Sequence, residues 1–147
     1  MFPIDCSEEV ARILYAPSMF HDGQLSMEAF RLTIKKDGKD EGYVSVWRTA
    51  KRSPKKRKKA KKYTKPRVEG DELVGFATLF VKQIEALEEG SCKSKVWSEK
   101  NDPDYYHVGI YYYLNEEQIK GLNDDPDYLL LTKELSLIAR PTIYENV

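Results

Sequence analysis

The strongest chemical signal in this sequence is a basic run between positions 51 and 67, which reads KRSPKKRKKAKKYTKPR. Eleven of its seventeen residues are Lys or Arg, and none is acidic. Side chains at this density can neutralise several phosphates and release condensed counterions, which gives a strong, salt-sensitive attraction to nucleic acid. The candidate nucleic-acid-binding residues are Lys51, Arg52, Lys55, Lys56, Arg57, Lys58, Lys59, Lys61, Lys62, Lys65 and Arg67.

The formal net charge of zero conceals a segregation of charge along the chain. The 147 residues include 24 basic and 24 acidic side chains. Because 11 of the basic residues lie in the run, 13 remain elsewhere, and the rest of the chain carries a net charge of −11. Like charges repel and do not pack, so we expect a solvated, mobile arm on an acidic folded body. The run contains one aromatic residue, Tyr63, which favours contact with the phosphate backbone over reading of bases. DNA and RNA are therefore not distinguished.

The same run is compatible with other partners. It could contact an acidic surface on this chain or on another protein, act only as a solubilising loop, or serve as a targeting signal in a host with a nucleus. We therefore weigh two hypotheses. In the first, the protein is a non-enzymatic accessory protein that binds phosphates through the arm. In the second, it is a protein-interaction module or a subunit of a multi-protein assembly, and the arm contacts an acidic surface.

A second candidate site lies on the segment YYHVGIYYYL at positions 105–114, which is rich in the residue types that favour strands. Alternation places one set of side chains on the same face, namely Tyr105, His107, Gly109, Tyr111 and Tyr113. Their phenols and imidazole, with space beside the glycine, could bind a base, a ribose or a peptide, and His107 could act as an acid or base. The alternative is that these amphipathic rings only cover a sheet face and direct their polar tips to water.

Signatures of familiar enzymes are missing from the sequence. It contains no GxSxG, GxxxxGK[ST], GxGxxG or HExxH motif. Its two histidines, His21 and His107, and its two cysteines, Cys6 and Cys92, lack the spacing of a metal site. We therefore expect no cofactor and no metal, and we favour a protein without catalytic activity. A small enzyme that uses His107 remains as a third hypothesis.

Composition limits the class of protein. With 41% hydrophobic and 33% charged residues, the chain reads as an ordinary folded domain, since a membrane protein would be more apolar and a disordered chain less so. No apolar run approaches the roughly 18 residues of a spanning helix, so we expect no membrane partner. The two cysteines and the absence of a signal-peptide pattern in the first ten residues predict a cytoplasmic location, or a nuclear one in a eukaryotic host.

The elements that position these sites are expected to form a single α+β domain spanning residues 1–147, with the 51–67 arm inserted in it. A capping box at Asp5 and Glu8 predicts a short helix through residues 10–14. Alternation predicts strands over 30–34 and 43–48, joined by a turn at Asp37-Gly38 into an antiparallel pair.

Farther along, helical spacing of apolar residues predicts a long helix within 71–89, although its apolar first half is also compatible with a strand. A brief strand at 96–97 and the 105–114 strand follow, then a helical turn capped by Asn115 and Gln118. Asp125-Pro126 starts a final helix that ends at Arg140-Pro141. The predicted architecture is a small antiparallel sheet of about three to four strands packed against two longer helices, with the mobile basic insertion after the second strand.

Overall fold

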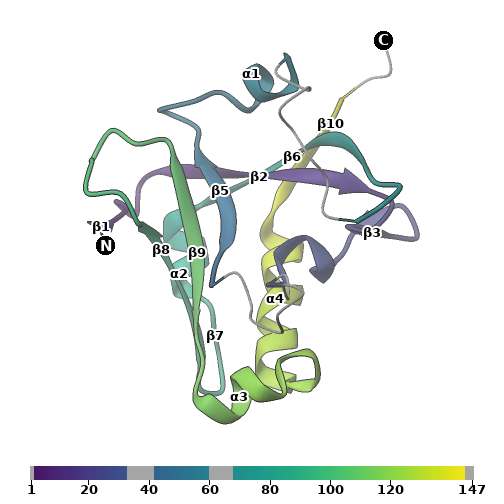
Figure 1. Cartoon of the computed structure of the whole chain (residues 1–147), viewed down its shortest axis with the longest axis vertical. Helices are drawn as coiled ribbons and strands as arrows, with labels where there is room; N and C mark the ends of the chain where they lie inside the picture. Colours follow the sequence, from purple (N-terminus) through teal and green to yellow (C-terminus); the bar gives the residue numbers. More distant parts are fainter. Residues whose placement is uncertain (1, 33–41, 60–67, 145–147) are drawn as a thin grey trace.

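A computed structural model describes residues 2–32, 42–59 and 68–144, and its dominant feature is one antiparallel sheet of eight strands (Figure 1). The order across the sheet is β1, β8, β9, β5, β2, β6 and β10, and β7 pairs with β8 outside this path. These strands are β1 (Phe2–Pro3), β2 (Glu9–Ala16), β5 (Val44–Arg48), β6 (Glu72–Phe80), β7 (Glu88–Glu89), β8 (Cys92–Ser98), β9 (His107–Tyr113) and β10 (Arg140–Ile143). A separate two-stranded sheet joins β3 (Phe20–His21) to β4 (Gln24–Leu25).

Helices are few and mostly short among the residues that the structure describes. They are α1 (Pro54–Lys59), α2 (Val81–Ala86), α3 (Glu116–Lys120) and α4 (Pro126–Ile138), with 3₁₀ turns η1 (Met27–Phe30) and η3 (Leu122–Asp124). The predicted fold class, a sheet of three to four strands against two longer helices, is therefore wrong. The protein is mostly sheet, because two segments that were expected to be helices are its long central strands.

The first of these segments is β2, where a helix through residues 10–14 was predicted. Val10, Ala11, Ile13 and Leu14 are all buried. A strand that is paired on both edges and covered on both faces buries every side chain, so its sequence lacks the alternation that marks a half-exposed strand. The expected capping residue Asp5 instead accepts hydrogen bonds from the backbone and hydroxyl of Ser7 in a turn.

The second segment is β6, which occupies the first half of the predicted 71–89 helix. It pairs with β2 over its whole length and with β10 on its other edge. Gly75 permits this second pairing, because a Cβ atom there would lie 2.1 Å from the carbonyl oxygen of Thr142. Only the following residues, Val81–Ala86, are helical, and they form α2.

The predicted antiparallel pair of strands over 30–34 and 43–48 is also wrong. Residues 27–30 form η1, and β5 pairs with β2 and β9 instead. The expected turn at Asp37-Gly38 and the end of the first predicted strand lie outside the described residues. The second strand is confirmed as β5, so the basic run does follow a strand directly.

The two predicted helix starts in the last third of the chain are confirmed, whereas strand β10 was not predicted. Asn115 and Gln118 form a reciprocal capping box at the start of α3, and Asp125 caps α4 with Pro126 in its first turn. Tyr128, Leu131 and Leu135 are fully buried on α4, which packs against η1 and β8. The predicted 105–114 strand is confirmed over the shorter range His107–Tyr113 as β9, and Val96 and Trp97 lie in the longer strand β8.

Strands β5, β9 and β8 have two unlike faces. The inner face carries buried residues such as Val46, Ile110 and Val96 and lies toward α2 and α4. Opposed residues of an antiparallel pair lie on the same face. The outer face, as used below, is therefore made of Tyr43, Ser45 and Trp47 on and next to β5, His107, Gly109, Tyr111 and Tyr113 on β9, and Lys93, Lys95 and Trp97 on β8.

The sheet bends sharply between β5 and β2. These strands pair at only two positions, Val10 with Arg48 and Ala11 with Trp47. Figure 1 shows β2 and β6 running across the direction of β5 and β9, with α1 at the upper end of β5, far from α3. The basic run therefore begins where the two halves of the sheet meet.

Candidate nucleic-acid interface

The first part of the basic run folds against the sheet. After β5, the backbone N–H groups of Lys51 and Arg52 donate to the carbonyl oxygen of Arg48 at 3.0 and 2.9 Å. Pro54 starts α1, and its carbonyl oxygen accepts a hydrogen bond of 3.1 Å from the hydroxyl of Tyr144. Residues 51–59 thus have a defined backbone, whereas the whole run was expected to be mobile. The candidate residues Lys61, Lys62, Lys65 and Arg67 lie outside the described residues, as does the side chain of Lys59.

Aromatic rings hold two arginines of this segment. The rings of Trp47 and Tyr106 are stacked, with centroids 4.6 Å apart and planes at 10°. The guanidinium carbon of Arg52 lies 4.5 Å from the Trp47 centroid and 4.7 Å from that of Tyr106. That of Arg57 lies 4.4 Å from the Trp47 centroid. Such cation–π contacts contribute about 0.5–2 kcal/mol each, depending on how far the cation is desolvated.

These contacts position positive charge without neutralising it. Lys58 is held in the same way, with its Nζ 4.6 Å from the Tyr144 ring, and Lys55 and Lys56 are exposed. Within the described part of the chain, none of the five basic residues from Arg52 to Lys58 forms an ion pair with a carboxylate. Within the described residues, no carboxylate therefore neutralises these five charges.

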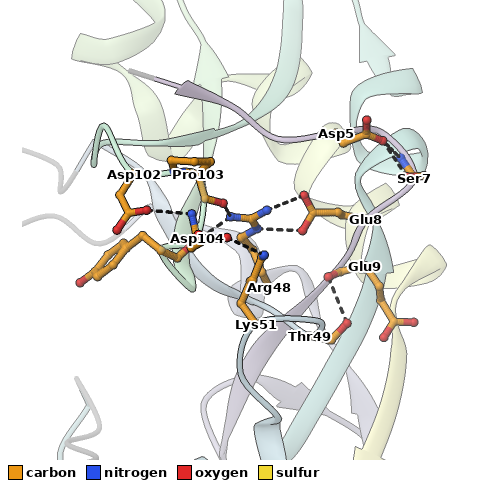
Figure 2. A network of polar contacts seen from close by, with 11 residues as sticks. Asp5, Ser7, Glu8, Glu9, Arg48, Thr49, Lys51, Asp102, Pro103 and Asp104 are labelled. Carbon is orange, nitrogen blue, oxygen red and sulfur yellow. Dashed lines mark hydrogen bonds and ion pairs between the residues drawn. The ribbon is translucent and has the colours of Figure 1, made fainter.

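Lys51 is the exception, and it belongs to a network that braces the start of the arm (Figure 2). Its Nζ lies 2.9 Å from Asp104 Oδ1, and this contact lowers the pKa of Asp104. Next to it, buried Arg48 donates to both carboxylate oxygens of Glu8, at 2.7 and 2.8 Å, and to the carbonyl oxygen of Pro103. The network ties the arm to the start of β2 and to the loop before β9.

The structure brings together three of the four residues of the second candidate site. Tyr105, His107 and Tyr111 line a hollow of about 110 Å³, together with Tyr43, Glu99, Lys100, Val108 and Gly109. Tyr113 also lies on the outer face, but beyond this hollow, and is 46% exposed. The space expected beside Gly109 is taken by Tyr43, because a Cβ atom there would lie 2.5 Å from the Tyr43 ring. Tyr43 therefore forms a wall of the hollow.

Apart from Lys100, whose Nζ lies 5.8 Å from the Tyr105 centroid, the polar groups of the hollow are neutral or hydrogen-bonded. His107 Nε2 lies 3.0 Å from Ser45 Oγ, and burial, together with the charge of Arg57, lowers the pKa of His107. The imidazole is therefore uncharged at neutral pH. The Tyr111 hydroxyl donates to Glu99 at 3.0 Å, and burial and this bond raise the pKa of Tyr111. The hollow offers ring faces and hydrogen-bonding groups, not a reactive pair.

A larger cavity of about 490 Å³ opens where β2 and β5 diverge. Buried Arg12 lines it and donates to the carbonyl oxygens of Ala29 and Ser45, at 2.8 and 3.1 Å. Arg57, in the middle of the run, and Val68, the residue that follows the run, also line it. Its volume falls in the range of small-ligand sites. Sequence reasoning missed this cavity, because it lies between β5 and β2, and a helix was predicted where β2 forms.

Potential metal ligands do not cluster in the described part of the chain. It contains no group of three or more His, Cys, Asp or Glu side chains placed to hold a metal ion. His21, at the end of β3, is exposed, and its Nε2 lies 3.4 Å from Asp22 Oδ2. No helix among residues 2–32, 42–59 and 68–144 is long and apolar enough to cross a membrane.

Comparisons with known protein families, with curated proteins and with solved structures give no match. Function must therefore be inferred from the geometry of the basic run and of the hollow lined by Tyr105, His107 and Tyr111.

Proposed function

We propose that this protein binds nucleic acid, without catalysing a reaction on it, through the basic run at positions 51–67. Its first half is anchored on the Trp47–Tyr106 stack, and its second half adds Lys61, Lys62, Lys65 and Arg67. The contacts are with phosphates, so affinity comes mainly from counterion release.

One observation carries this proposal: Arg52 and Arg57 rest on aromatic rings instead of carboxylates. If the arm were folded onto the acidic body through ion pairs, carboxylates of the body would already neutralise its basic side chains. Here the body supplies 24 carboxylates, yet among Lys51, Arg52, Lys55, Lys56, Arg57 and Lys58 only Lys51 pairs with one in the described structure. The acidic remainder of the chain repels a polyanion, which disfavours contact with surfaces distant from the arm.

The salt dependence of binding tests the proposal. If the protein makes about 6–10 phosphate contacts, affinity for a labelled oligonucleotide falls by about 10³–10⁵ between 50 and 200 mM salt. Fluorescence anisotropy measures it. The triple variant Lys61→Gln, Lys62→Gln, Lys65→Gln should bind more weakly and flatten the plot of log affinity against log salt by up to about three units of slope.

A matched control removes the same charge elsewhere. Lys82, Lys120 and Lys133 are exposed on α2, α3 and α4, so their triple replacement by Gln should change the slope much less. Equal losses in the two triple variants, or an affinity that does not change with salt, would refute binding through the arm.

A second candidate function is a protein-interaction module, and exposed side chains on α4 favour it. Leu130 and Leu137, seven residues apart on one side of the helix, are 43% and 73% exposed. In that case, a protein complex recovered from cells survives nuclease treatment. The double variant Leu130→Ser, Leu137→Ser loses the complex. A variant whose basic residues between positions 60 and 67 are replaced by neutral ones keeps it.

A further inference from the structure

The hollow beside the arm is lined by rings that the core does not require. Strand β9 contributes Val108, Ile110 and Tyr112 to the buried inner face, while Tyr105, His107 and Tyr111 stay half-buried on the other side. A sheet covered on one face only needs no cluster of aromatic rings on its other face, where polar residues are usual. Packing of the core therefore does not explain why Tyr105, His107 and Tyr111 lie on this face.

Ring contacts make this surface continuous. Tyr43 lies with its centroid 5.2 Å from that of Tyr111 and 6.0 Å from that of His107, and Tyr105 lies 6.5 Å from His107. The wall is well defined, because Gly109 allows the Tyr43 ring to lie directly on the strand.

The hollow is joined to the arm by two ring-to-ring steps. Tyr105 lies 4.9 Å from Tyr106, and Tyr106 lies 4.6 Å from Trp47, the ring that holds Arg52 and Arg57. A second cation lies at the hollow itself, since Lys100 Nζ is 5.8 Å from the centroid of Tyr105. Arg52 and Arg57 thus lie at one end of this row of rings and Lys100 at the other. The distances from these cations to the nearest ring centroids, 4.4–5.8 Å, are similar to the distances between neighbouring rings.

We propose that the hollow stacks an unpaired base of a single-stranded nucleic acid whose phosphates lie on Arg52, Arg57 and Lys100. This inference rests on the proposed function and deepens it by naming the form of nucleic acid. Bases are planar and aromatic, so they stack on tyrosine and histidine rings irrespective of sequence. In a duplex both faces of each base are covered by neighbouring pairs, so a duplex engages the arm but not the hollow.

Charge complementarity selects this occupant over a peptide. A strand supplies a phosphate for each base, which matches rings that alternate with cations. Neutral His107 and the carboxylate of Glu99 offer hydrogen-bonding partners to the edge of a base without adding a positive charge inside the hollow.

The test compares a single strand with a duplex of equal length. Affinities of dT₁₂, rU₁₂ and a 12-base-pair duplex are measured by anisotropy at one salt concentration. Replacement of a stacking ring by alanine typically weakens single-strand binding by about 5- to 150-fold. We expect Tyr105→Ala and Tyr111→Ala each to show a loss in this range on single strands and little change on the duplex, whereas Tyr105→Phe, which keeps the ring, retains the preference. Similar affinities for dT₁₂ and rU₁₂ indicate that the base face is recognised, and a strong difference indicates that the sugar also contributes.

Phe80→Ala serves as the control, because it removes an exposed ring at the end of β6 that does not line the hollow. A second measurement needs no variant: a strand carrying 2-aminopurine loses fluorescence when the base stacks in the hollow. Unchanged 2-aminopurine emission on saturation, or equal losses on strand and duplex in the alanine variants, would overturn the inference while leaving phosphate binding by the arm intact. If the wild-type protein binds neither form at low salt, the proposed function itself fails.

Discussion

At the scale of single residues, Arg52 and Arg57 indicate how a charged segment can be ordered and still keep its charge. An ion pair would fix the position of each guanidinium, but it would also compete with any phosphate. A ring face attracts the cation and leaves the N–H donors without a carboxylate partner. The Nε atom of Arg57 is buried and has no hydrogen-bond partner in the described structure, so one donor there is still unused.

His107 provides a prediction at this scale. Burial and the charge of Arg57 lower its pKa from the ordinary 6.5, so the unfolded chain takes up a proton there before the folded chain does. The free energy of unfolding therefore decreases as the pH falls below about 6.5 and is retained above it. Between about pH 7 and pH 5, we expect a smaller decrease in His107→Gln than in the wild type. Urea unfolding at the two pH values measures the free energy of unfolding of both proteins. The same decrease in His107→Gln and in the wild type would contradict the prediction.

Only part of the candidate site could be predicted from the sequence. The run at 51–67 is evident from composition, and the face with His107 follows from the period of a strand. The docking of the arm on Trp47 and Tyr106 was not evident, because these rings lie far apart in sequence and meet only through the pairing of β5 with the start of β9. Tyr43 and Glu99 were missed for the same reason.

At the scale of elements, the long central strands explain why sequence patterns failed. Strand β2 is buried along its length, and β6 is mostly apolar from Leu73 to Phe80 and paired on both edges, so neither alternates between apolar and polar positions. Spacing alone cannot separate such strands from a buried helix. Strand β9 and helix α4 each have one buried side, and for them the periodicity predicted the correct element.

Gly75 gives the prediction at this scale. A methyl group there would meet the backbone of Thr142, and backbone cannot move aside as a flexible side chain can. We expect Gly75→Ala to force β10 away from β6 and to lower the free energy of unfolding by about 1–3 kcal/mol, as overpacking does. The midpoint of urea unfolding reports the loss, and hydrogen exchange should localise it to the amides that pair β6 with β10.

Gly121 is the matched control for that change. It follows α3 with an ordinary negative φ of −109°, and an added Cβ atom would find its nearest neighbour at 3.8 Å. Gly121→Ala should therefore alter stability by less than about 0.5 kcal/mol. If both variants lose the same stability, the close approach of β10 is not the cause.

At the scale of the whole molecule, the fold separates a buried thiol from an exposed one. Cys6 is exposed, whereas Cys92 is fully buried where β8 begins, and burial raises the pKa of Cys92 to about 12. We expect a thiol reagent to modify Cys6 rapidly and Cys92 only when the sheet opens. In Cys6→Ser the rapid phase should vanish, and urea should accelerate the slow phase in proportion to the unfolded population. Rapid modification of both thiols in native protein would contradict this packing.

The position of Trp47 beneath two arginines gives the molecule a built-in optical reporter. The chain contains only two tryptophans, Trp47 and Trp97, so Trp97→Phe leaves a single emitting indole under α1. Its emission depends on whether the guanidinium groups remain on the ring or are drawn away by an approaching anion. Rapid-mixing experiments on unlabelled protein can therefore resolve whether α1 stays docked during encounter with a ligand or lifts off first.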